Sequence, residues 1–198
     1  DGGRTVLISG CIDTQKVHIS SAIASGYKYM LIVTSDEAKA RKMCDDASFF
    51  NKEAIYYPAK DAIFYSADVH GNQITGERLR CISRIINHSS TGEGVLTVVT
   101  TMDGIADRLI PVERFKEAVI TLDYSSEIEP EKLAKKLVAM GFVRTGMVED
   151  KGQFAIRGGI IDIFSYTDEA PVRIELWDTE VDSIRMFDVE SQRSIERL

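Results

Sequence analysis

The sequence predicts an α/β protein of two domains: a parallel-sheet domain over residues 1–114 and a small α+β domain over residues 115–198. In the first part, short apolar segments alternate with segments of helical period, which is typical of a parallel sheet covered on both faces. In the second part, one helical segment precedes runs in which apolar and polar residues alternate with period two. Such runs, separated by polar breaks, indicate a mainly antiparallel sheet with one buried face.

The first domain is expected to contain four strands connected by helices. Each strand is predicted from a short apolar run, at residues 5–9, 29–33, 54–57 and 95–99. Helices are predicted at residues 17–24, 36–49, from 75 past 86, and 103–109. Asp36 or its neighbour Ser35 caps the second helix and Thr75 caps the third, because short polar side chains accept hydrogen bonds from a first turn. Residues 58–74 show no period and are expected to form a long loop.

The second domain is expected to begin with a strand at residues 118–122 and a helix at residues 130–140. Pro130 fits the first turn of that helix, and Gly141 fits its end. Residues 152–188 then predict an antiparallel sheet. The polar side of this sheet is either an ordinary solvated surface or a docking surface for another protein. Its predicted members are Arg157, Asp162, Arg173, Glu175 and Arg185.

The charge is unevenly distributed and argues against broad electrostatic binding to DNA. The net charge of the chain is −7; residues 1–112 carry −1 of it and residues 113–198 carry −6. An acidic half offers little attraction for a phosphate backbone, so a protein partner fits better. The three cysteines and three histidines are scattered, which indicates a reducing compartment and disfavours a metal cluster. No apolar run reaches membrane-spanning length.

A phosphate-binding loop is nearly present after the first predicted strand. The motif G-x-x-x-x-G-K-[ST] aligns with residues 10–17, and both Gly10 and Lys16 match it. Gln15 replaces the second glycine, and Val17 replaces the hydroxyl that holds Mg²⁺. Asp13 adds a negative charge where the polyphosphate would lie. ATP hydrolysis is therefore not expected here, since positioning and metal supply nearly all of the catalysis.

A long motif in the second domain carries a resemblance to a known family. It reads F-x-x-R-G-G-I-I-D-I-F at 154–164, P-V-R-I-E-L at 171–176, D-T-E-V-D-S-I-R at 178–185, F-D at 187–188 and S-Q-R-S at 191–194. These residues closely resemble the bacterial transcription-repair coupling factor and, more distantly, excinuclease B. By this resemblance the first domain is similar to a degenerate P-loop-type domain 1A, and the other is similar to domain 2. Excinuclease B keeps an intact phosphate loop, so Gln15 and Val17 favour the coupling factor.

The resemblance implies a role for the chain. Members of this family push stalled RNA polymerase off damaged template and recruit excinuclease A, which docks on domain 2. The motor and polymerase-binding domains lie downstream of this region, so RNA polymerase and DNA would be reached only through them. The resemblance therefore implies a non-catalytic, cytoplasmic adaptor without a cofactor and without a membrane contact. The alternative is a nucleotide-binding or DNA-binding fragment of an excinuclease B-like helicase.

The matching positions also suggest binding residues. Arg144 and Arg157 are the expected donors of charge-assisted hydrogen bonds to acidic groups on excinuclease A. Phe154 and Phe164 are candidate apolar anchors if either side chain faces outward. The expected rim consists of Arg173, Glu175 and Arg185. By the same reasoning the degenerate loop is scaffolding, formed by Gly10, Gln15, Lys16 and Val17.

Overall fold

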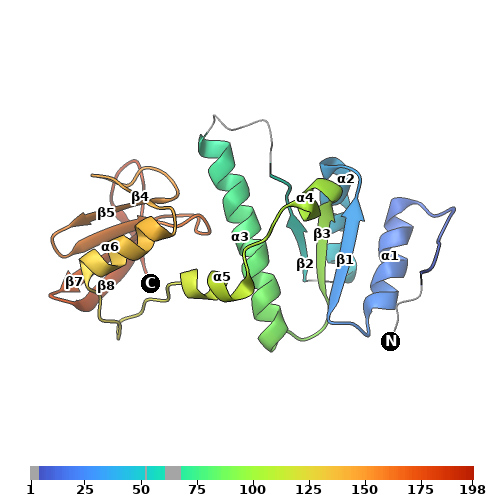
Figure 1. The fold of residues 1–198 in the computed structure, drawn as a ribbon, viewed down its shortest axis with the longest axis horizontal. Helices are drawn as coiled ribbons and strands as arrows, with labels where there is room; N and C mark the ends of the chain where they lie inside the picture. Colours follow the sequence, from blue (N-terminus) through green and yellow to red (C-terminus); the bar gives the residue numbers. More distant parts are fainter. Residues whose placement is uncertain (1–4, 52, 61–67) are drawn as a thin grey trace. The chain divides into compact units, whose positions relative to one another are not determined.

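The computed structural model describes residues 5–51, 53–60 and 68–198 and divides the chain into two compact units (Figure 1). The first unit comprises Asp1–Ala62 and Glu77–Arg108, and the second comprises Ile63–Gly76 and Leu109–Leu198. The long helix α3 (Asp68–Thr91) therefore contributes residues to both units. The predicted domain limit after residue 114 stays a prediction, because compactness alone does not define a domain.

The first unit is built on a three-stranded parallel sheet in the order β1-β3-β2, as expected from the alternating pattern. Tyr29 of β1 lies opposite Leu96 of β3, and Ala54 of β2 lies opposite Thr97. The described elements besides α3 are α1 (Asp13–Ala24), β1 (Tyr29–Thr34), α2 (Glu37–Phe50), β2 (Ala54–Tyr57), β3 (Leu96–Thr101) and α4 (Met102–Ala106).

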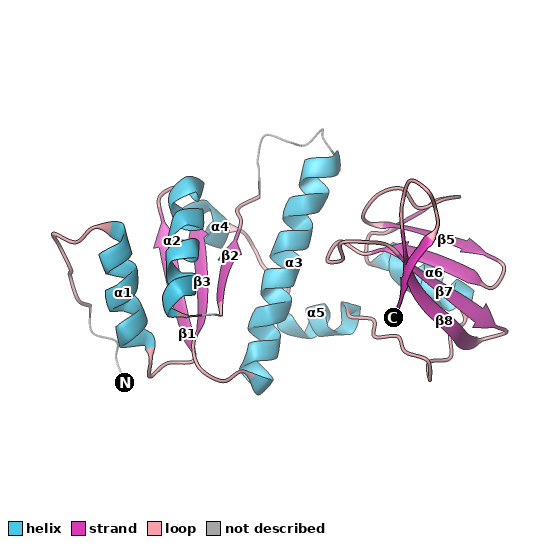
Figure 2. Cartoon of the chain, turned by 180° about the vertical axis from the view of Figure 1, so that it is seen from behind, coloured by secondary structure: helices cyan, strands magenta, loops and turns pink. Residues whose placement is uncertain are grey.

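Helices cover both faces of this sheet (Figure 2). On one face, α2 packs Ala40, Met43 and Ala47 against Val99 of β3. On the other face, α3 places Cys81 against residues of β2 and β3. The predicted cap of α2 is confirmed, since the Asp36 side chain accepts a 2.8 Å hydrogen bond from the backbone N–H of Lys39.

Two predictions for the first unit are wrong. Residues 5–9 form no strand and are exposed, with Leu7 at 92%. An apolar run needs a neighbouring strand to satisfy its backbone, and residues 5–9 have none among the described residues. The predicted loop at 58–74 is wrong at its end, because α3 begins at Asp68 and not at Thr75. Residues 61–67 of that loop lie outside the described residues.

The second unit contains a six-stranded sheet in the order β4-β5-β6-β7-β8-β9. β4 runs parallel to β5, and every other neighbouring pair is antiparallel, so the predicted mainly antiparallel sheet is confirmed. The elements are α5 (Val112–Ala118), α6 (Pro130–Ala139), β4 (Val143–Arg144), β5 (Gln153–Arg157), β6 (Ile160–Phe164), β7 (Val172–Trp177), β8 (Glu180–Phe187) and β9 (Ser194–Arg197).

The entry to the second unit differs from the prediction. Residues 112–118 form helix α5, and the strand expected at 118–122 is absent. Ile120 and Leu122 are instead half-buried and pack against the main core of the unit without joining the sheet. Their apolar character reflects this packing, which sequence periodicity cannot distinguish from a short buried strand.

The main core of the second unit lies between α6 and one face of the sheet. Leu133 and Leu137 of α6 pack against Phe154, Ile161 and Ile174 of the strands. The other face of the sheet carries a second, smaller cluster at one end. Its members are Val148, Ala155, Phe164 and Phe187. The sheet is thus apolar on one face, and on the other face it is apolar at one end and polar elsewhere.

The two buried cysteines are expected to be unreactive in the folded protein. Burial raises the pKa of the Cys81 thiol to about 12 and also raises that of Cys44, so both stay protonated and poorly nucleophilic near neutral pH. Cys11 is only partly covered. We expect a thiol-specific reagent at about pH 8 to modify Cys11 quickly and the other two only after denaturation. Fast native labelling of all three would contradict the buried positions.

Candidate protein-binding face

One buried carboxylate organises the polar face of the second unit. Asp162 on β6 has no exposed side-chain surface and lies directly opposite Arg173 on β7. Arg173 donates from Nε to Asp162 Oδ1 at 2.7 Å and from Nη2 to Oδ2 at 2.9 Å. Arg157 donates from Nη2 to Oδ2 at 2.5 Å. Two arginines therefore satisfy one buried charge, which is the condition under which such a charge is tolerated.

The two arginines have different surroundings. The Arg173 side chain is 16% exposed, its guanidinium lies 4.5 Å from the centre of the Phe187 ring, and its Nη1 donates to the Gln192 carbonyl. Hydrogen bonding to Asp162 raises the pKa of Arg173 further above its usual value. The Arg157 side chain is 42% exposed, and its Nη1 donates to the Gly146 carbonyl at 2.9 Å. Arg157 thus presents a fixed guanidinium to solvent, while Arg173 is mainly structural.

A second polar group lies beside this one on β7 and β8. Glu175 accepts a 2.8 Å hydrogen bond from Ser183 Oγ and a longer one of 3.5 Å from Arg185 Nη2. Arg185 pairs with Arg173 across the strands, so both side chains lie on the same face. The predicted placement of Arg157, Asp162, Arg173, Glu175 and Arg185 on one side of the sheet is therefore confirmed. Within this set, Arg157 and Arg185 are about 40% exposed.

Trp177, the last residue of β7, was not among the binding residues predicted from the sequence. Its side chain is 81% exposed, and it is the only tryptophan in the sequence. Along β7 it continues the side that carries Arg173 and Glu175, since Leu176 between them packs toward the main core. An exposed tryptophan on the face of the sheet that also carries a fixed arginine has the composition of a protein-binding hot spot. The signal in the sequence was a large aromatic residue on the polar side of an alternating strand.

The structure does not place Phe154 and Phe164 on the outer surface. Phe154 is fully buried in the main core, and Phe164 is 8% exposed in the smaller cluster on the opposite face. Alternation alone would have buried only one of them. The smaller cluster buries the other, so neither side chain faces outward as an apolar anchor.

Arg144 lies apart from the other candidate arginines. It belongs to β4 at the sheet edge and pairs with Phe154, whose side chain points to the main core. Its Nη2 lies 3.6 Å from Glu131 of α6. Arg144 and Arg157 therefore lie on opposite faces of the sheet, and their joint role in binding excinuclease A stays a prediction.

The degenerate phosphate loop is internally neutralised. The Asp13 carboxylate accepts a 3.0 Å hydrogen bond from Lys16 Nζ and lies 3.6 Å from Lys39 Nζ. The Lys16 hydrogen bond is the main cause that lowers the pKa of Asp13. Gln15 Oε1 accepts from the backbone N–H of Ile12 at 3.2 Å, and Val17 is fully buried in the sheet core. Each position that departs from the motif has a structural contact of its own.

We expect Mg-ATP to bind this chain more weakly than about 1 mM, because Asp13 repels phosphate and occupies both lysines. Isothermal titration calorimetry with Mg-ATP measures this directly, and an intact phosphate-loop protein serves as the positive control. Micromolar binding would contradict the description of the loop as scaffolding.

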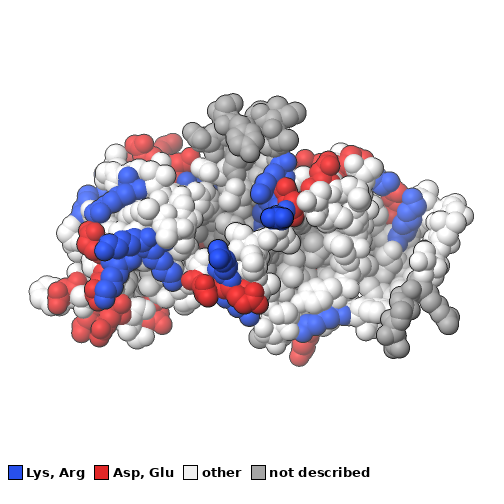
Figure 3. All heavy atoms as spheres, in the orientation of Figure 1, with Lys and Arg blue, Asp and Glu red and all other residues white. Residues whose placement is uncertain are grey.

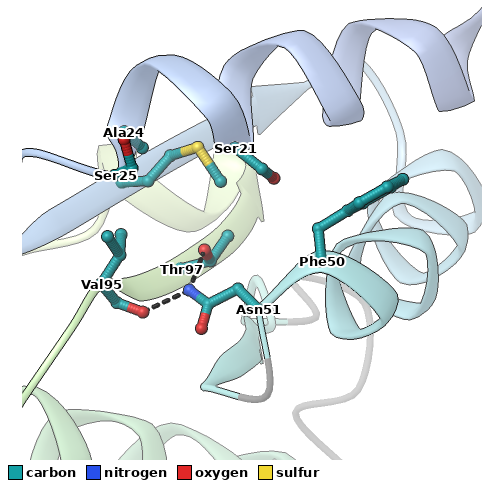
Figure 4. Close-up of a pocket in the computed structure, with 8 residues that line it drawn as sticks. Ser21, Ala24, Ser25, Phe50, Asn51, Val95 and Thr97 are labelled. Atoms are coloured by element: carbon teal, nitrogen blue, oxygen red, sulfur yellow. Dashed lines mark hydrogen bonds between the residues drawn. The ribbon is translucent and has the colours of Figure 1, made fainter.

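The described part of the first unit also holds a pocket of about 260 Å³ (Figure 4). It lies near the last turn of α1, where Ser21 and Phe50 line it, and not at the loop that precedes this helix. Asn51 donates to the Val95 carbonyl and, at 2.9 Å, to Thr97 Oγ1. These bonds join the end of α2 to β3 and the residue before it, so the Asn51 amide at the pocket is engaged in structural contacts.

Comparison with known proteins identifies the second unit first. The sequence family described as “UvrB interaction domain” matches residues 120–198, which contain α6 and the whole six-stranded sheet. The second unit is therefore of the class of UvrB interaction domains. No helix in the described ranges combines the length and apolar character needed to cross a membrane.

The chain as a whole is similar to part of the transcription-repair-coupling factors, which confirms the resemblance found in the sequence. The factor of Bacillus subtilis (strain 168) is 37% identical over 201 residues, covering 100% of this chain and 17% of the relative. The factor of Staphylococcus aureus (strain USA300) is 36% identical over 196 residues, covering 98% and 16%. The factor of Staphylococcus haemolyticus (strain JCSC1435) is 36% identical over 199 residues, with the same coverage. The chain thus spans about a sixth of the length of these relatives.

Proposed function

We propose that this chain is a non-catalytic adaptor module that recruits excinuclease A to stalled RNA polymerase in transcription-coupled nucleotide excision repair. The observation that carries the proposal is the Asp162-anchored Arg157 with exposed Trp177, in the unit that matches the UvrB interaction domain. A fixed arginine loses little conformational freedom on binding, and together with an exposed aromatic on the same face of the sheet it can accept both acidic and apolar partner groups.

The proposal assigns different roles to the two units. The second unit docks excinuclease A through Arg157 and Trp177, with Glu175 and Arg185 at the rim. The first unit acts as scaffolding without a cofactor, since Asp13 neutralises the lysines of the former phosphate loop. RNA polymerase and DNA are contacted by other segments of the longer protein, and the module acts in the cytoplasm. This division requires no chemistry from the chain itself.

Binding of the purified chain to purified excinuclease A tests the proposal. We expect Trp177→Ala and Arg157→Ala each to weaken binding about thirtyfold, equivalent to about 2 kcal/mol, as truncation of a central anchor does. Surface plasmon resonance measures both, and the unfolding midpoint of each variant is recorded beside the affinity. Trp177→Ala is the cleaner variant, because its exposed ring contributes little to the fold.

Arg144→Ala is the matched control, since it removes a similarly exposed arginine from the opposite face of the sheet. It is expected to leave the affinity within about twofold. If the wild-type chain does not bind excinuclease A, the proposed function is wrong. If Arg144→Ala weakens binding as much as Arg157→Ala does, the assigned face is wrong while the function stands.

A further inference from the structure

Helix α6 presents a basic outer face on an otherwise acidic part of the chain. Leu133, Ala134 and Leu137 are buried and define the inner side of the helix. At 100° per residue, Lys132, Lys135 and Lys136 fall together on the opposite side. All three are exposed, and a blue area covers the α6 region on the left of Figure 3. Residues 113–198 carry a net charge of −6, so this concentration of lysines is local.

The positive charge of this face is only partly neutralised within the chain. Lys132 Nζ lies 2.6 Å from Glu129, and Arg144 Nη2 lies 3.6 Å from Glu131. Among the described residues, no carboxylate lies within 4.0 Å of the ammonium groups of Lys135 or Lys136. Lys136 in the last turn favourably opposes the helix dipole, whereas Lys132 lies in the first turn and gains nothing from it. The excess is available to an outside acidic group.

An apolar side chain adjoins the lysines. Val138 on α6 is 56% exposed. On the helix, Val138 lies on the side that also carries Glu131, and Glu131 contacts Arg144 on β4. Val143, the residue before Arg144, pairs with Gln153 and lies on the opposite face of the sheet. A phosphate backbone would make no use of Val138, whereas an amphipathic protein segment would cover it.

We propose that this surface, the α6 face, docks an acidic amphipathic segment of a partner protein. It consists of Lys132, Lys135, Lys136, Val138 and Arg144. Charge complementarity orients such a segment, and the exposed Val138 contacts its apolar residues. The α6 face lies on the opposite side of the sheet from Arg157, so it is a second contact surface, independent of the proposed docking of excinuclease A.

Nuclear magnetic resonance titration of the isotope-labelled chain tests this inference. The probe is a short amphipathic helix made of glutamate and leucine, compared with the same peptide carrying serine for leucine and with a short DNA duplex. We expect amide shifts confined to α6 and β4 with the first peptide and weaker binding by the other two. The Lys135→Glu, Lys136→Glu double variant is expected to weaken peptide binding at least about tenfold.

The matched control is the Arg114→Glu, Lys116→Glu double variant, which makes the same change of charge on α5 in the same unit. It is expected to bind the peptide within about threefold of the wild type, as long-range effects are screened by salt. Trp177→Ala is expected to bind it unchanged. Shifts elsewhere, equal loss in both double variants, or tighter binding of the duplex would overturn the inference.

Discussion

Asp162→Ala is expected to destabilise the second unit by about 3–5 kcal/mol, because removing one partner of a buried ion pair leaves the other uncompensated. Asp162 is fully buried, and both Arg157 and Arg173 direct their guanidinium groups to it. Arg173, at 16% exposure, cannot turn into water without leaving its site above Phe187. Hydrogen exchange at the amides of β5 to β8 during urea titration measures the loss in this unit separately.

Asp182→Ala provides the control for this prediction. Asp182 lies on β8 of the same sheet and is exposed, so its removal is expected to change stability by less than about 0.5 kcal/mol. If Asp162→Ala costs no more than Asp182→Ala, the two arginines do not depend on the carboxylate. In that case the account of Arg157 as a fixed donor would be wrong.

Phe154→Ala is expected to cost about 3–5 kcal/mol, the range measured when a large buried aromatic is truncated. The ring is fully buried and belongs to the core that joins α6 to the sheet. Thermal unfolding measures the change, and Ile195→Ala on β9, which is 63% exposed, is the control with little expected effect. The expected cost follows from Phe154 being a core residue and not the surface anchor that its place in the motif suggested.

The same variant separates stability from recognition. At a temperature where Phe154→Ala remains folded, its affinity for excinuclease A is expected to stay within about twofold of the wild type. A large loss of affinity in a fully folded variant would show that the core residue reaches the interface. A small loss of stability would show that the core between α6 and β5 is looser than its burial implies.

Sequence pattern predicted those elements whose signal is local. The strands at 29–33 and 54–57, the Asp36 cap and the helix at 130–140 all depend on neighbouring residues, and the structure confirms them. Residues 5–9 and 118–122 have the same apolar character but form no strands. Strand formation requires a partner, and the partner is set by the tertiary fold.

On the candidate face, prediction from the sequence pattern is limited in the same way for single side chains. Alternation correctly placed Arg157 and Arg173 on one side, because strand period is a local property. Their different roles depend on the strand register, which places Asp162 of β6 directly opposite Arg173 of the neighbouring strand β7. Phe164 was misjudged because alternation assumes one buried face, whereas the cluster around Phe187 buries part of the other. The exposed fraction of Trp177 likewise follows only from the assembled sheet.

The shared carboxylate of Asp162 links the folding of the module to its recognition of a partner. A substitution of Arg157 that adapts the surface to a different partner also removes one of the two cations that neutralise the buried Asp162 carboxylate. During evolution, adaptation to a new binding surface is therefore expected to proceed through Trp177, Glu175 and Arg185, whose replacement leaves Asp162 paired. Arg157 is therefore expected to change slowly, and the binding residues that do not contact Asp162 are expected to change more quickly.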